Sequence, residues 1–160
     1  MADRLEVTRT VDVPAEQLFA LLRTPSRHAE MDGAGMVGGV EDGVKRVRGV
    51  GDEFIMNMHN PVLGDYQTKN TVVTFEANLA IGWASALHPE GSHADKLGDM
   101  KPGGHTYTWH LFPQGSATRI TLVYDWSEVQ DPQFRALLPL LNEEQLGESI
   151  EKAARASSEG

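Results

Sequence analysis

Alternation of apolar and polar residues recurs along most of this chain and constrains its fold more than any other feature. The segments that show it are residues 4–13, 53–59, 66–75, 79–87, 106–112 and 117–129. A period of two is typical of strands with one buried face. The last two segments flank Pro113-Gln114-Gly115-Ser116, which predicts a hairpin. Successive strands joined by turns predict an antiparallel sheet whose apolar face needs a cover.

Helical spacing follows the first strand and closes the chain. Pro14 precedes an apolar face at residues 18, 19, 21 and 22, which predicts a helix to about Arg23. Thr24-Pro25 predicts a second short helix over residues 26–31. A short apolar helix is expected from Asp131-Pro132 through Leu138, and residues 142–145 have the form of a capping box before the last helix.

The order of these segments favours an α+β fold in one domain, residues 1–160. A strand, two short helices, a run of antiparallel strands and a terminal helix do not form a βαβ alternation. We therefore expect a curved antiparallel sheet that wraps round a long C-terminal helix. Residues 88–104, rich in glycine and proline, predict a long loop at one rim of the sheet.

Charge and composition exclude several classes of partner. The chain has 14 basic and 23 acidic residues, a net charge of −9, and no cysteine. A field of this sign repels phosphate backbones, so no nucleic-acid partner is expected. No apolar run reaches the ~18 residues of a membrane span, so no stable membrane insertion is expected. We expect a cytoplasmic protein, monomer or homodimer, with no cofactor.

Two stretches of sequence resemble a known superfamily. They are Val11-Asp12-Val13-Pro14-Ala15-Glu16-Gln17-Leu18-Phe19 and Gly115-x-x-Thr118-Arg119-Ile120-Thr121-Leu122. With the order of elements, they are similar to the START-like superfamily (SRPBCC), which includes polyketide cyclase/dehydrase and birch-pollen-allergen proteins. The resemblance implies a helix-grip fold with a deep cavity, which different members use for lipids, hormones, polyketides or protein clients. Here Met31-Asp32-Gly33 replaces a tryptophan that many members carry.

Aromatic, sulfur-containing and apolar residues on the expected strands and last helix are candidates for contact with a ligand. They are Met56, Met58, Tyr66, Trp83, His105, Tyr107, Trp109, Tyr124, Trp126, Leu146 and Ile150. Such side chains on a concave sheet bind flat or flexible apolar molecules. Packing of an ordinary core explains them equally well. His105 follows two glycines and is expected at the rim of the sheet.

Catalytic and metal signals are weak. His59, Asp65, Tyr66 and Tyr124 are the candidates for proton transfer, but the sequence favours the alternative that Asn60 and Asp65 close the turn between two strands. The six histidines lack the spacing of a metal site, so no metal is expected. No nucleophile elbow, phosphate-binding loop or dinucleotide fingerprint occurs in the sequence.

Three functions remain open on these grounds. The first is a binding or carrier protein for a small hydrophobic or aromatic ligand, such as a lipid or a polyketide-like molecule, in an internal cavity. The second is a polyketide cyclase, aromatase or dehydratase that acts in the same cavity. The third is a protein-interaction module of the chaperone co-activator type, in which an exposed apolar surface binds the partner.

Overall fold

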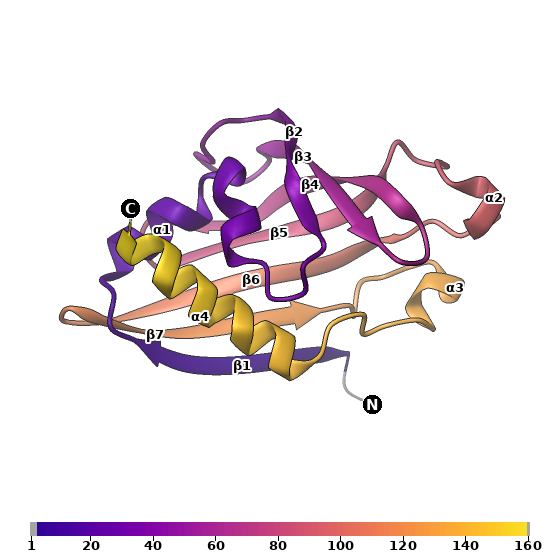
Figure 1. Cartoon of the computed structure of the whole chain (residues 1–160). Helices are drawn as coiled ribbons and strands as arrows, with labels where there is room; N and C mark the ends of the chain where they lie inside the picture. The colour runs from indigo at the N-terminus through magenta and orange to yellow at the C-terminus, as the bar shows by residue number, and fades with distance from the viewer. Residues whose placement is uncertain (1–2, 160) are drawn as a thin grey trace.

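A curved antiparallel sheet dominates the computed structural model, which describes residues 3–159 (Figure 1). Within these residues its strands are β1 (Arg4–Val11), β2 (Val37–Gly43), β3 (Glu53–Asn60), β4 (Gly64–Glu76), β5 (Ala80–His88), β6 (Gly103–Gln114) and β7 (Ala117–Asp125). Their order across the sheet is β1-β7-β6-β5-β4-β3-β2. The first strand, β1, therefore pairs with the last, β7. All the remaining pairs join strands that follow one another in the sequence.

The helices lie mostly on the concave side of this sheet. They are α1 (Ala15–Leu22), the 3₁₀ helix η1 (Pro25–Met31), α2 (Ala94–Leu97), α3 (Pro132–Arg135) and α4 (Glu143–Glu159). The capping box is confirmed, because Asn142 and Gln145 exchange hydrogen bonds between side chain and backbone at 3.0 and 2.8 Å. No helix in the described part of the chain is both long enough and apolar enough to cross a membrane.

The predicted fold class is confirmed, and the differences lie at the ends of elements. The strand expected to reach residue 129 ends at Asp125, whose carboxylate accepts hydrogen bonds from the backbone and hydroxyl of Ser127 and so starts a turn. The helix expected through residue 138 ends at Arg135. The segment expected as loop, residues 88–104, contains the short helix α2.

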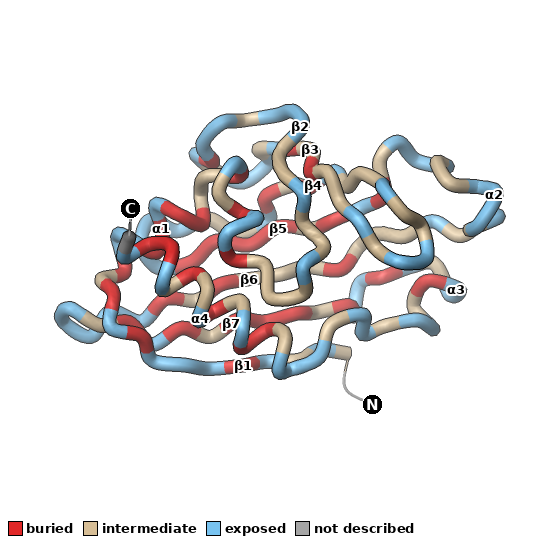
Figure 2. Tube along the Cα trace, in the orientation of Figure 1, coloured by how far each residue is buried: buried red, intermediate tan, exposed pale blue. Residues whose placement is uncertain are grey.

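Helix α4 packs on α1, η1, β1 and β7 and closes one end of the layer. Figure 2 shows buried positions along the strands and the inner side of α4, whereas the segment around α2 is exposed or partly buried. Ile150 of α4, Leu18 of α1 and Ile81 of β5 have no exposed surface. Side chains that bury this much apolar area supply most of the stability of such a layer.

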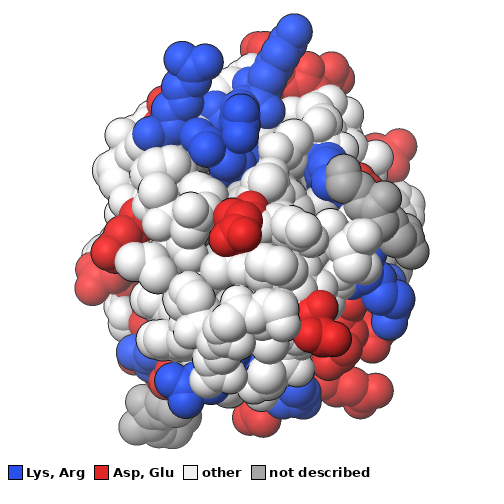
Figure 3. Space-filling model, turned by 90° about the vertical axis from the view of Figure 1, so that its left-hand side faces the viewer, with Lys and Arg blue, Asp and Glu red and all other residues white. Residues whose placement is uncertain are grey.

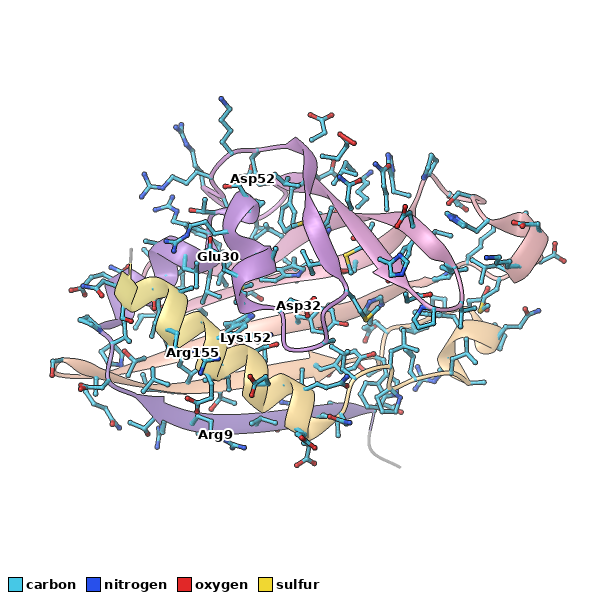
Figure 4. The ribbon with its side chains drawn as sticks, in the orientation of Figure 1. Arg9, Glu30, Asp32, Asp52, Lys152 and Arg155 are labelled. Carbon is cyan, nitrogen blue, oxygen red and sulfur yellow. The ribbon has the colours of Figure 1, made fainter. Side chains whose placement is uncertain are left out.

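The segment after η1 lies directly against α4. The backbone N–H of Gly33 donates to Ser149 Oγ at 2.9 Å, and Lys152 Nζ donates to the carbonyl of Asp32 at 3.2 Å. In Figure 4 Lys152 on α4 lies beside Asp32. A Cβ atom at Gly33 would lie 2.3 Å from the carbonyl oxygen of Gln145. Glycine is therefore required where the segment crosses the helix.

Candidate ligand-binding cavity

A cavity of about 300 Å³ lies between the concave face of β3–β6, residues 31–37 and the first turns of α4. The turn between β3 and β4, the α2 segment and the connection from α3 to α4 complete its wall. Most of the lining is apolar, and a few polar side chains interrupt it. This composition is typical of sites for small organic molecules.

Most of the residues expected to contact a ligand line this cavity. They are Met56, Met58, Tyr66, Trp83, His105, Tyr107, Trp109 and Leu146. They come from β3, β4, β5, β6 and α4, which converge because the sheet curves round the helix. Whether they contact a ligand is part of the proposal made below.

Tyr124, Trp126 and Ile150 lie elsewhere, so the expectation that they face the cavity needs correction. The ring of Tyr124 stacks on Tyr107 at 4.8 Å between centroids, and its hydroxyl accepts a hydrogen bond from the Leu140 N–H at 3.2 Å. Trp126 packs against Tyr124 at 5.1 Å. Ile150 follows Leu146 by about one helical turn and lies fully buried in the core. These three side chains support the layer behind the cavity wall.

The proposed set of catalytic residues does not converge on the cavity. His59 and Asp65 form a pair at the β3–β4 turn, with His59 Nδ1 2.9 Å from Asp65 Oδ1. Their side chains are 64% and 97% exposed, because both alternate to the outer side of the strands. Of the candidates His59, Asp65, Tyr66 and Tyr124, Tyr66 is the one whose side chain lines the cavity.

The turn itself supports the alternative that its polar residues serve the backbone. Asn60 Oδ1 accepts from the backbone N–H groups of Val62 and Leu63 at 3.0 and 2.7 Å. This arrangement is an Asx turn, which fixes the loop through the side chain of its first residue. The turn thereby holds Val62 and Leu63 at the edge of the cavity.

A row of polar side chains crosses the floor of the cavity. Two of its members, Asn70 and Ser85, were missed in the sequence, and the third, His105, was expected at the rim of the sheet but lies buried here. Asn70, Ser85 and His105 face one another on β4, β5 and β6, because Asn70 pairs with Ser85 and Ser85 pairs with His105. They are 4%, 7% and 9% exposed. We call these three residues the polar row. Buried polar groups need hydrogen-bond partners.

Two members of the polar row bind each other. The Ser85 hydroxyl donates to Asn70 Oδ1 at 2.5 Å. Asn70 Nδ2 donates to Thr68 Oγ1 at 3.1 Å and to the carbonyls of Phe54 and Thr68 at 3.4 Å. The amide and the hydroxyl are therefore satisfied within the wall.

His105 differs, because its Nδ1 is buried without a hydrogen-bond partner among the described residues. Burial lowers the pKa of His105 to about 4, so the ring is neutral near pH 7. The pKa of His28 is also lowered to about 4 by burial, but its Nε2 donates to the Leu22 carbonyl at 2.7 Å and its ring stacks on Trp83. The cavity wall thus holds two neutral histidines, of which His28 has a hydrogen-bond partner and His105 has none among the described residues.

Phenol and carboxylate groups complete the polar part of the wall. Burial raises the pKa of Tyr66, and burial followed by the neighbouring Tyr124 raises the pKa of Tyr107 well above 10, so both phenols stay protonated. The carboxylate of Asp32 accepts from the N–H groups of Ala34, Met36 and Val37. Asp32 therefore shapes the segment that closes one side of the cavity.

Two basic side chains reach the border of the cavity without lining it, since Lys96 Nζ donates to the carbonyl of Val62 at 3.0 Å and Lys152 Nζ to that of Asp32 at 3.2 Å. The described residues that line it include Asp32 but no lysine or arginine. Figure 3 views the end of the molecule that is formed by α1 and the last turns of α4. Lys and Arg side chains gather along one edge of this view. At this end the pKa of Arg23 is lowered by burial and by the nearby Arg46 and Arg48. The described lining itself therefore supplies no cation to pair with an anionic ligand.

The mouth of the cavity is apolar. The side chains that form this rim are Val62, Leu63, Leu97, Met100, Leu137 and Leu140. They belong to three segments far apart in sequence, and Val62, Leu137 and Leu140 are 69%, 54% and 49% exposed. An exposed apolar border is suited to the entry of a poorly soluble molecule.

No family model matches this chain. It is 32% identical over 126 residues to an uncharacterised protein of Mycobacterium tuberculosis, a match that covers 75% of this chain and 47% of that protein. The chain thus spans about half the length of the curated relative it matches.

Solved structures give matches along almost the whole chain. A protein from Arthrobacter aurescens has a TM-score of 0.70 at 20% identity, and the match covers 99% of this chain and 88% of that protein. The AHSA1 protein from Silicibacter pomeroyi has a TM-score of 0.63 at 19% identity, and the match covers 98% of this chain and 99% of that protein. The ZhuI aromatase/cyclase from Streptomyces sp. R1128 has a TM-score of 0.62 at 14% identity, and the match covers 97% of this chain and 93% of that protein.

At such identities the likeness concerns the backbone and leaves the chemistry of the site to be argued from its own residues. The shared features are the seven-stranded curved sheet and the long C-terminal helix that crosses it. The chain has the helix-grip fold of these solved structures.

Proposed function

We propose that this protein binds a small, largely apolar or aromatic molecule in the cavity beneath α4. The observation that carries the proposal is the cavity itself, about 300 Å³ of space lined by apolar and aromatic side chains. A core that served stability alone would be filled, since protein interiors pack as densely as organic crystals. Space of this size, with a few polar groups at fixed positions, supports ligand binding.

Several wall residues are suited to this role. Trp83, Trp109 and Tyr107 present aromatic surface, and Met56 and Met58 add flexible side chains that adjust to the shape of a guest. The apolar rim gives such a guest a route from solvent. The binding of a neutral apolar molecule requires nothing further from the wall.

Binding of N-phenyl-1-naphthylamine, a neutral dye whose fluorescence rises in apolar surroundings, tests this proposal. We expect saturable binding to the wild-type protein. Met58→Trp should reduce the affinity at least about tenfold, because the larger ring fills space that the dye needs. Ile55→Trp is the matched control, since Ile55 lies on the same strand with its side chain on the opposite face.

Absence of dye binding to the wild-type protein would overturn the proposal. Equal binding by both tryptophan variants would also overturn it, because the dye would then lie outside the cavity. Far-UV circular dichroism and urea unfolding establish that each variant is folded before the affinities are compared. Native mass spectrometry of the freshly purified protein is a second test, in which a bound small molecule supports the proposal.

Cyclisation or dehydration of a polyketide in the same cavity is a second candidate function. The structural likeness to an aromatase/cyclase favours it, and the unpaired ring of His105 is the wall group best placed to exchange a proton. A pKa of about 4 makes this imidazole a weak base near pH 7, which places catalysis second. Turnover of a poly-β-ketone thioester that is lost in His105→Phe would reverse this order.

A further inference from the structure

The polar row determines which chemical groups a guest must carry, on the premise that the cavity binds a ligand as proposed above. The Ser85 proton is committed to Asn70 Oδ1, and the Asn70 amide protons are directed to Thr68 and to the Phe54 carbonyl. A carbonyl only accepts, which fixes the orientation of the Asn70 amide. Ser85 Oγ therefore has lone pairs to offer a guest and no free proton.

His105 lies beside Ser85 in the β5–β6 register and has the opposite need. As a neutral imidazole it carries one N–H donor and one acceptor nitrogen. No hydrogen bond joins its ring to another side chain or backbone group within residues 3–159, and its Nδ1 is buried. Nδ1 has almost no accessible surface, so the ring nitrogen that a guest can reach is Nε2, which keeps accessible surface and has no partner among the described residues.

The charges around the row oppose an anionic guest. The described cavity wall has no lysine or arginine, and its one carboxylate, Asp32, carries negative charge. The Arg23, Arg46 and Arg48 cluster lies at the packed end of the molecule, beyond the cavity lining. A carboxylate group in the cavity would lose its hydration without gaining a counter-charge from the lining.

We propose that the ligand of this cavity is a neutral molecule with an alcohol or phenol hydroxyl, which binds between Ser85 and His105. The hydroxyl donates its proton to Ser85 Oγ, and its oxygen accepts from the N–H of the His105 ring. A hydroxyl is the simplest group that donates and accepts at one atom, so it satisfies both residues. An ether or ketone of the same shape can only accept and leaves Ser85 Oγ without a donor.

Three naphthalenes of similar shape test this inference by isothermal titration calorimetry near neutral pH. They are 2-naphthol, 2-methoxynaphthalene and 2-naphthoate, which carry a hydroxyl, an ether and a carboxylate. We expect 2-naphthol to bind about tenfold more tightly than 2-methoxynaphthalene, which is the usual effect of one hydrogen bond. We expect 2-naphthoate to bind most weakly of the three.

Variants locate the effect on the polar row. In Ser85→Ala the preference for 2-naphthol over 2-methoxynaphthalene should fall from about tenfold to about onefold, while 2-methoxynaphthalene still binds. His105→Phe should weaken both compounds by about tenfold and keep the preference between them, because the oxygen of each accepts from the ring N–H. His110→Phe is the matched control, because His110 lies on the same strand outside the cavity lining and should leave the preference unchanged. The comparison of ligands on the wild-type protein decides the matter even where a variant does not fold.

The outcomes separate this inference from the proposed function. Equal affinity for the three compounds, or tightest binding of 2-naphthoate, would overturn the hydroxyl preference and leave a cavity that binds apolar molecules. A preference that Ser85→Ala leaves unchanged, or affinities that His105→Phe leaves unchanged, would also overturn it. Failure of the dye and of all three naphthalenes to bind would instead remove the proposed function.

Discussion

The two ends of the layer between sheet and helices differ in how completely side chains fill them. At the packed end Leu18, Ile81 and Ile150 have no exposed surface. At the hollow end Met58 and Tyr66 are half-buried around the cavity. Helix α4 serves both ends, since Leu146 lines the cavity and Ile150, about one turn later, lies in the filled core.

This difference indicates that the two halves of α4 have different roles, one in stability and the other in forming the cavity. A filled core at one end supplies free energy of folding, so the other end can keep space and unpaired polar groups that cost stability. The comparison predicts that substitutions at the packed end change the free energy of unfolding, whereas substitutions at the hollow end change binding.

Truncation at the two ends tests the comparison most directly. Ile150→Ala should lower the free energy of unfolding by about 4 kcal/mol, because it opens a void in a core that cannot collapse. Met58→Ala should cost about 1 kcal/mol or less, since its side chain already borders empty space. Urea unfolding of both variants measures the contrast, and equal losses would contradict it.

Acid should weaken the hollow end through its two buried histidines. The pKa values of His28 and His105 are about 4 in the folded protein and near 6.5 in the unfolded chain, which therefore binds more protons between these values. Their contribution is fully present above about pH 6.5 and is lost as the pH falls toward about 4, by roughly 3 kcal/mol for each histidine.

Urea unfolding at about pH 7.5 and about pH 4.5 measures this loss. His105→Phe should make the free energy of unfolding less dependent on pH, and the double variant with His28→Phe should reduce the dependence further. The readout is the change between the two pH values, so a variant that is less stable at both remains informative. The same pH dependence in His105→Phe and in the wild-type protein would contradict the prediction.

The crossing of residues 31–33 over α4, where the two ends meet, should show the smallest of these effects. Gly33→Ala places a methyl group against the Gln145 carbonyl and the Ser149 backbone, and should cost about 2 kcal/mol as the first turns of α4 shift. Gly49→Ala is the control, because a Cβ atom there meets open space. Thermal unfolding compares the two, and a similar Tm would show that the segment yields without strain.

Local sequence patterns predicted much of the fold. The capping box at residues 142–145, the hairpin at Pro113-Gln114-Gly115-Ser116 and the alternating strands each depend on residues close together in the chain. The aromatic residues of β5 and β6 at the cavity were found for the same reason, because they stand out in an alternating pattern. Tyr124 stands out equally but lies beside Tyr107, outside the cavity lining, which no local pattern reveals.

The polar row shows why the rest could not be predicted. Near the β4–β5 turn Glu76 faces Ala80 and Thr74 faces Gly82, and regular pairing continued from there would set Asn70 opposite Ala86. A bulge between Val72 and Thr74 shifts the register by one residue, so Asn70 faces Ser85 instead. The sequence carries no clear signal for this bulge, and the same shift decides which face of β4 lines the cavity.

The sequence by itself determined the order of elements, the helix-grip fold and the apolar character of the concave face, because each depends on periodicity and on caps between near neighbours. Only the tertiary structure decided that the space beneath α4 is partly empty and that Asn70, Ser85 and His105 meet there. The reason is that strand register and the curvature of the sheet arise from the sum of contacts between distant segments, and no single segment contains them.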